Sequence, residues 1–284
     1  MFNPSATLIT QCIKSLQAGY RHTYGDLKPA YAELIGQVAT SVLWAIARSD
    51  ALYHNIDHTI AVVLVGQEIL RGKQLQESNV SCQSWAHFII SLLCHDIGYV
   101  KGVCRQDRIE QRTYATGINH QTIVIAPGAT DASLTAFHVD RSKLFVIETL
   151  ANQPLLDLAV INHNIELTRF PVPKDDLHQD IASDAGLARA ADLIGQLSDP
   201  YYLEKIPALF YEFEEAGTNQ TLGYRHPGDL RANYPAFFHT VVCPYIRPAL
   251  HYLQATPKGE HTVISLYANL FKVEQEGMAL VPSL

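Results

Sequence analysis

Apolar residues recur every three or four positions along most of the chain, which is the spacing of amphipathic helices. The pattern covers residues 31–48, continues over 56–70 until Arg71–Gly72, and returns over 85–93. Further helical patterns lie at 141–151, 155–163, 182–197, 200–215, 235–254 and 261–272. Alternating patterns typical of strands are scarce, and residues 122–126 form the one candidate. We therefore predict an all-α fold.

The periodicity fades between Ile97 and His138, where glycines and prolines accumulate. Gly98 is suited to the left-handed conformation that closes helices, so we expect the preceding helix to end there. Loops longer than ~15 residues are uncommon in compact domains and often cover a binding site. We predict that this segment, about 97–138, is a long irregular lid.

The length and composition favour one large domain. With 284 residues, 48% hydrophobic and 17% charged, the chain can bury a substantial core. We expect an N-terminal helical extension over residues 1–50, packed on a core domain at 51–255. A C-terminal helix and tail at 256–284 completes the predicted organisation.

The charged residues and the cysteines limit the classes of binding partner and the cellular compartment that we expect. The formal charge is -7 and the 21 Lys and Arg are scattered, so the basic stripe expected for long nucleic acids is missing. The five cysteines form no Cys-x-x-Cys pair, which favours a reducing compartment. No apolar run approaches the ~20 residues of a membrane helix. We expect a cytoplasmic protein that acts on a small molecule.

Histidine and aspartate residues supply the candidate chemistry. His54 and His58 are four positions apart, so both would share one face of a helix that begins early enough. The His95–Asp96 doublet ends an apolar helix, where a buried carboxylate is costly unless it is paired or binds a cation. Asp192 lies in mid-pattern beside small residues that let a neighbouring helix approach. Two imidazoles and two carboxylates suit Zn, Fe, Mn or Ni, with Mg or Mn possible at a second position.

The order of these residues resembles that of the HD-domain metal-dependent phosphohydrolases. Tyr53-His54-Asn55-x-x-His58 is similar to the opening signature of the cyclic-nucleotide phosphodiesterases within that superfamily. Residues 191–193, followed by 198–200, resemble their segment around the last metal aspartate, and residues 237–244 resemble their base-binding wall. The likeness covers about residues 53–250 as separate islands.

The resemblance implies a role for each residue of the set. His58, His95, Asp96 and Asp192 would bind a first divalent metal, and Asp96 would bridge to a second. His54 would be the general acid that protonates the leaving oxygen. The activity implied is hydrolysis of a phosphomonoester or phosphodiester of a nucleotide-like small molecule by metal-activated water, with one or two ions of Zn, Fe, Mn, Ni or Mg.

Two positions depart from the phosphodiesterase pattern. Tyr99 replaces the last histidine of His-Asp-x-x-His, so the outer ligation of the second metal differs. Tyr234 stands at the purine-selecting glutamine, and a phenol lacks the donor and acceptor pair of a carboxamide, so a cyclic purine nucleotide is not the expected substrate. Phe237 is either core or a ring that stacks on a flat substrate. The other candidate substrate contacts are Tyr53, Lys101, His163 and Arg169.

Two alternative functions remain open at this stage. An HD-type di-iron oxygenase, resembling the inositol oxygenases, would use additional histidines such as His120, His138 and His163. A non-catalytic HD module would bind a nucleotide as a sensor without turnover.

Overall fold

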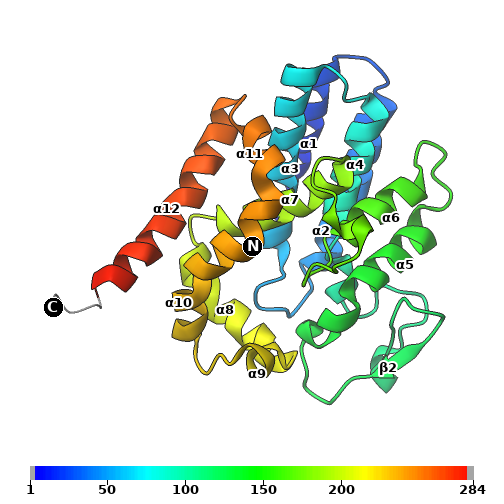
Figure 1. The fold of residues 1–284 in the computed structure, drawn as a ribbon. Coiled ribbons are helices and arrows are strands. Elements are labelled where there is room, and N and C mark those ends of the chain that lie inside the picture. Colours follow the sequence, from blue (N-terminus) through cyan, green and yellow to red (C-terminus); the bar gives the residue numbers. More distant parts are fainter. Residues whose placement is uncertain (1–3, 280–284) are drawn as a thin grey trace.

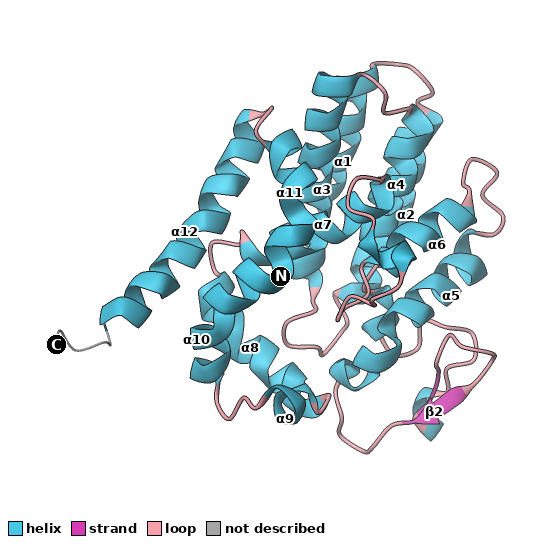
Figure 2. Ribbon diagram, viewed as in Figure 1, coloured by secondary structure: helices cyan, strands magenta, loops and turns pink. Residues whose placement is uncertain are grey.

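The computed structural model describes residues 4–279 and consists of helices apart from one small hairpin, which confirms the all-α prediction (Figures 1 and 2). The longer helices are α1 (Pro4–Tyr24), α2 (Ala30–Ile46), α3 (Ile56–Glu77), α4 (Cys82–Cys94), α5 (His138–Leu150), α6 (Leu158–Leu167), α7 (Asp184–Leu197), α8 (Tyr202–Glu215), α10 (Pro227–Phe237), α11 (Cys243–Leu253) and α12 (Pro257–Ala279). A short helix, α9 (Thr218–Leu222), follows α8.

Helix α3 lies at the centre of the structure and packs against α1, α4, α7, α11 and α12. Its closest neighbour is α7, because small residues line their contact. A Cβ atom on Gly195 would lie 2.7 Å from Val62 Cα, and one on Gly66 would lie 3.5 Å from Ala191 Cβ. The expected close approach of a helix beside Asp192 is thus confirmed.

Helix α3 does not stop at Gly72 as the sequence pattern suggested. It continues to Glu77 and ends at Ser78, which has a left-handed φ of 54°. A Cβ atom on Gly72 would lie 1.9 Å from the Tyr252 carbonyl oxygen. The glycine therefore permits close packing of α3 against α11 and does not terminate the helix.

The predicted helix at 235–254 is divided into three parts. Helix α10 ends at Phe237, a π-helical turn (η5, Phe238–Val242) follows, and α11 begins at Cys243. Prolines at 235, 244 and 248 lack the backbone N–H that a continuous helix requires, which accounts for the irregular hydrogen bonding here.

The segment before α5 is more ordered than predicted. It contains the turns η1 (Ile97–Tyr99), η2 (Ile109–Gln111) and η3 (Asp131–Phe137), and an antiparallel hairpin of β1 (Thr113–Ala115) with β2 (Thr122–Val124). The candidate strand at residues 122–126 is present as β2, and the chain between these short elements follows the expected irregular path. A lid role for the segment stays a prediction.

One buried arginine holds this segment in place. Arg141 of α5 is fully buried and donates hydrogen bonds to the carbonyl oxygens of Gly98, Val100 and Ala115. Its guanidinium also pairs with the buried Asp107 carboxylate at 2.9 Å. The segment is thereby tied to α5 at four points.

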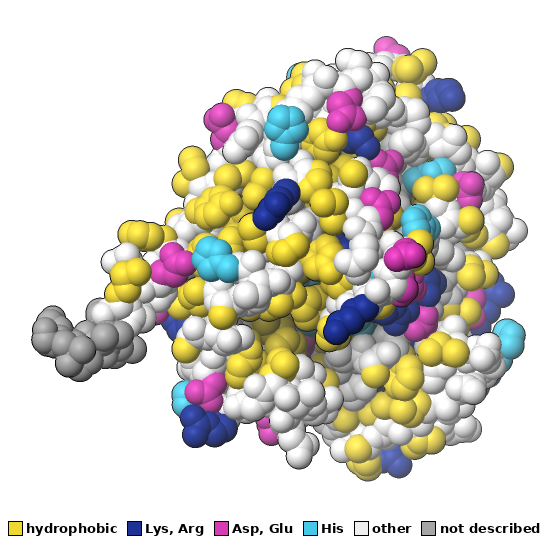
Figure 3. Space-filling view, viewed as in Figure 1, with side chains coloured by type: hydrophobic (Ala, Val, Ile, Leu, Met, Phe, Trp, Pro, Cys, Tyr) yellow, Lys and Arg dark blue, Asp and Glu magenta, His cyan; other side chains and the backbone are white. Residues whose placement is uncertain are grey.

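Most buried hydrophobic side chains of the described residues share one core, which runs from Ile9 of α1 to Val273 of α12, and a small second cluster of Tyr114, Ile125 and Leu134 lies in the segment before α5. The chain is accordingly a single helical domain. Within residues 4–279, no helix combines the length and the apolarity needed to cross a membrane. On the face shown in Figure 3, Lys and Arg side chains are interspersed with acidic ones.

We expect Arg141→Ala to lower the free energy of unfolding by about 3–5 kcal/mol, because it leaves the Asp107 carboxylate buried without its partner. Urea denaturation followed by circular dichroism measures the loss. Arg225→Ala is the matched control, because Arg225 is 82% exposed and should change stability by less than about 0.5 kcal/mol. Equal stabilities for the two variants would contradict the anchoring role of Arg141.

Candidate metal centre

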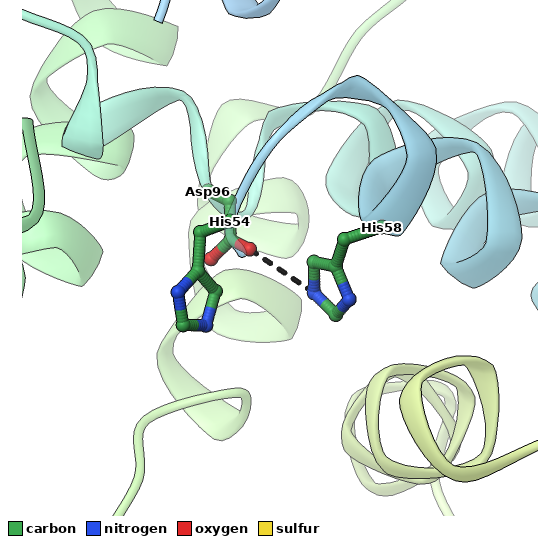
Figure 4. A group of neighbouring side chains, drawn as sticks. All are labelled: His54, His58 and Asp96. Atoms are coloured by element: carbon green, nitrogen blue, oxygen red, sulfur yellow. Dashed lines mark ion pairs between the residues drawn. The ribbon is translucent and has the colours of Figure 1, made fainter. Parts of the chain in front are cut away.

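The start of α3 places the first two histidines. The Asn55 side chain accepts a hydrogen bond from the Asp57 N–H at 3.0 Å, which caps the helix and makes Ile56 its first residue. His58 therefore lies in the first turn, and His54 precedes the helix. The condition for a shared helical face is not met, because the helix begins after His54, yet the two imidazole centroids are only 5.4 Å apart (Figure 4).

A buried glutamate holds His54 in this position. Glu212 of α8 accepts hydrogen bonds from the backbone N–H groups of Tyr53 at 2.7 Å and His54 at 3.1 Å. Its second carboxylate oxygen lies 2.5 Å from His54 Nδ1. Burial alone would raise the pKa of Glu212, but His54 and these hydrogen bonds hold that pKa below its usual range. Glu212 was missed in the sequence because it lies in an ordinary amphipathic helix.

The His95–Asp96 doublet follows the last residue of α4. His95 Nδ1 lies 2.7 Å from the Leu92 carbonyl oxygen and donates to it, which leaves the Nε2 lone pair free to bind a cation. Gly98 does not adopt the expected left-handed conformation. A Cβ atom there would lie 1.9 Å from the His138 carbonyl oxygen, so the glycine allows α5 to pack directly against this turn.

Four side-chain atoms from α3, α7 and the end of α4 converge on one point. His58 Nε2 lies 3.2 Å from Asp96 Oδ2 and 3.2 Å from Asp192 Oδ1, and the first of these pairs is marked in Figure 4. His95 Nε2 lies 3.2 Å and 3.5 Å from the same two oxygens. Metal–ligand bonds of about 2.0–2.2 Å place neighbouring ligands about 3–3.5 Å apart. The four atoms thus have the separations of one coordination sphere.

Two of these buried atoms lack a hydrogen-bond partner among residues 4–279. His95 Nε2 and Asp96 Oδ2 are both buried, and neither has a hydrogen-bond partner. Unsatisfied buried polar atoms are costly, and a shared cation would satisfy both. The mixed nitrogen and oxygen set suits Zn, Fe, Mn or Ni. These residues therefore fit a divalent metal ion.

The electrostatics of the cluster favour positive charge. Burial would raise the pKa of Asp96, but the His95 and His58 imidazoles hold it well below its usual range. Burial would lower the pKa of His58, but the neighbouring Asp192 and Asp96 carboxylates raise it to about 9. Protons therefore compete with a metal for this site, and metal binding should weaken as the pH falls.

Tyr99 and a further histidine complete the surroundings of Asp96. The Tyr99 ring stacks between the rings of His54 and His138, with centroids 4.5 Å from each. His138 Nδ1 donates to the Thr135 carbonyl oxygen at 2.6 Å, so its Nε2 lone pair is free, and that atom lies 3.9 Å from Asp96 Oδ1. His138, which the sequence offered only as an additional histidine for the di-iron alternative, thus lies beside the cluster.

The cationic candidates for substrate binding have other partners. Lys101 Nζ donates to the Ala129 carbonyl oxygen at 2.6 Å. Arg169 pairs with Glu166 at 2.5 Å and with Asp140 at 2.9 Å. Neither side chain is free to hold a phosphate in this arrangement.

The aromatic candidates lie in different surroundings. Tyr53 is buried against His54 and His58, with ring centroids 5.3 and 5.5 Å away. Tyr234 is 2% exposed and packs edge-on against Tyr202, so it belongs to the core. His163 is exposed. Phe237 is half-buried and meets the exposed Phe170 ring edge-on at 5.9 Å.

A comparison with models of protein families shows to which family the chain belongs. Over residues 2–276 it matches the model of the family described as Npun_R2479-like. The chain belongs to that family. No curated protein matches it. In this Npun_R2479-like protein, the candidate metal ligands come from three segments that are far apart in the sequence.

We expect His95→Ala to lower the bound metal content more than tenfold, because it removes one of four ligands and leaves two carboxylates facing each other. Elemental analysis of the purified protein measures the ratio of metal to chain. His163→Ala serves as the matched control, because His163 is exposed and should leave the ratio unchanged. Full metal content in the His95 variant would exclude it as a ligand.

Proposed function

We propose that the protein is an HD-type metal-dependent phosphohydrolase that cleaves a phosphomonoester or phosphodiester of a nucleotide-like small molecule. The observation that carries the proposal is the convergence of His58, His95, Asp96 and Asp192 within one coordination sphere. The order of these ligands along the chain agrees with the resemblance to that superfamily.

Two residues of the candidate site are partly exposed to solvent. The Asp192 side chain is 22% exposed and that of His54 is 17% exposed, whereas His58 and His95 are buried. A divalent ion held here would activate water and neutralise charge on the phosphoryl oxygens. Because Lys101 and Arg169 are engaged elsewhere, charge neutralisation depends on the metal site itself.

His54 has the surroundings of a general acid. Glu212 binds its Nδ1, so Nε2 is the ring atom that can give a proton to a departing oxygen. The contact of the Glu212 carboxylate with Nδ1 and its two backbone hydrogen bonds keep the orientation of the ring. His54 would therefore deliver the proton while the four other residues hold the metal.

We expect His54→Ala to retain the metal and to slow turnover by ~100-fold or more, as for loss of a general acid. Glu212→Gln should keep the metal and reduce turnover less, because the imidazole remains but loses its charged partner. Phosphate release from a panel of phosphate esters and nucleotides, with Mn, Mg, Ni, Fe or Zn, gives the rates, and elemental analysis gives the metal content. Full activity in His54→Ala would refute the assignment.

One observation favours a second cation and keeps the di-iron oxygenase as a second candidate function. His138 Nε2 and Asp96 Oδ1 are 3.9 Å apart, on the side of Asp96 away from His58. Oxygen uptake with a polyol or a phosphonate in the iron-loaded protein would favour the oxygenase, whereas phosphate release favours hydrolysis.

If a second ion binds between these atoms, His138→Ala should reduce the metal content from two ions per chain to one, because the first site keeps all four of its ligands. Metal titration followed by elemental analysis counts the ions. His163→Ala, which changes an exposed histidine, should leave the count at two. A count of two in the His138 variant would argue against its role as a ligand.

A further inference from the structure

Arg189 is a buried arginine with an incomplete set of partners. It lies on α7 one turn before Asp192 and is 2% exposed. Its Nε–H donates to the Leu167 carbonyl oxygen at 2.7 Å. The two terminal nitrogens are buried and have no hydrogen-bond partner among residues 4–279. Four N–H donors of the guanidinium are thus unused.

The charge of Arg189 is also uncompensated. No carboxylate of the described residues forms an ion pair with it. Asp180 attracts the guanidinium from beyond ion-pair distance. The Asp180 carboxylate instead accepts hydrogen bonds from the backbone N–H groups of Ala182 and Ser183. Burial lowers the pKa of Arg189, but a guanidinium remains charged in proteins.

An aromatic ring covers the guanidinium. The Arg189 Cζ atom lies 4.6 Å from the centre of the Tyr245 ring, a cation–π contact. Tyr245 belongs to the first turn of α11, directly after the π-helical turn, and is itself partly exposed. A ring face attracts the charge but accepts none of the four free N–H groups in a linear hydrogen bond.

We propose that Arg189 anchors a binding site for an oxyanion, a phosphate or carboxylate group, and that Tyr245 is the cover of this site. The two terminal nitrogens offer the planar fork that binds two oxygens of such a group at once. Rotation of the partly exposed Tyr245 ring opens the way to them.

The position on α7 suggests the source of the anion. Arg189 and Asp192 are three residues apart, which is about 4.5 Å along a helix. We assign the anion to a second acidic group of a substrate that is held at the metal centre on the same helix. This assignment to the substrate rests on the proposed function, whereas the oxyanion site itself does not.

Thermal unfolding in a phosphate-free buffer, with added inorganic phosphate as the probe, tests the site. In the purified protein we expect the melting temperature to rise by about 3 °C or more at saturating phosphate. Arg189→Met should abolish this rise and, without phosphate, should melt at the same temperature or higher, since an unpaired buried charge is gone. Arg247→Met is the control, because Arg247 is exposed on the same helix as Tyr245 and should keep the full rise.

A parallel titration after chelation of metals separates this site from the metal centre. A rise that survives chelation and needs Arg189 supports the proposal. A rise that is equal in wild type and Arg189→Met overturns it, and so does the absence of any rise. If wild type and Arg189→Met show the same rise and chelation removes it in both, phosphate binds at the metal centre. The Arg189 site is then refuted, while the proposed function is unaffected. Tyr245→Ala provides a second variant, which should lower the phosphate concentration needed for half of the rise.

Kinetics of the metal-loaded protein identify the source of the anion. With a nucleoside 3′,5′-bisphosphate, Arg189→Met should raise KM at least tenfold, and with the corresponding 5′-monophosphate it should leave KM unchanged. Equal KM changes for the two substrates would overturn the assignment to the substrate and leave a site for a free anion.

Discussion

The structure is organised around the mutual attraction of two carboxylates and two imidazoles in a largely buried cluster. Asp96 and Asp192 would repel each other in such surroundings, and only positive charge between or beside them makes their proximity tolerable. The helices that carry these groups pack closely because glycines such as Gly66 and Gly195 remove the side chains that would separate them. Close helix packing and the grouping of charges are thus two aspects of one constraint.

The helical class and most helices could be predicted from the spacing of apolar residues, because burial of one helix face leaves a regular trace in a sequence. Gly72 shows the limit of that approach. A glycine that ends a helix and one that lets another helix touch the backbone look the same until the partner, here Tyr252, is known. The order in the segment after α4 was equally hidden, since it depends on Arg141, which lies beyond the segment itself.

The candidate metal ligands could be predicted because their residue types and spacing are distinctive, whereas the group that orients His54 could not. Glu212 acts on His54 from a helix far away in the sequence. Arg189 illustrates a third case. Its importance lies in contacts that the folded chain fails to make, and only coordinates reveal an unmade contact.

The stacked rings of His54, Tyr99 and His138 have a mechanical consequence. They come from the segment before α3, the turn after α4 and the start of α5, so the column adds the segment before α3 to the two parts that Arg141 already ties together. A shift of α5 would move His138 against the Tyr99 ring, and Tyr99 would in turn displace the His54 imidazole. The spatial relation between His54 and His138, which lies beside Asp96, is therefore set by the thickness of aromatic rings, which hardly compress.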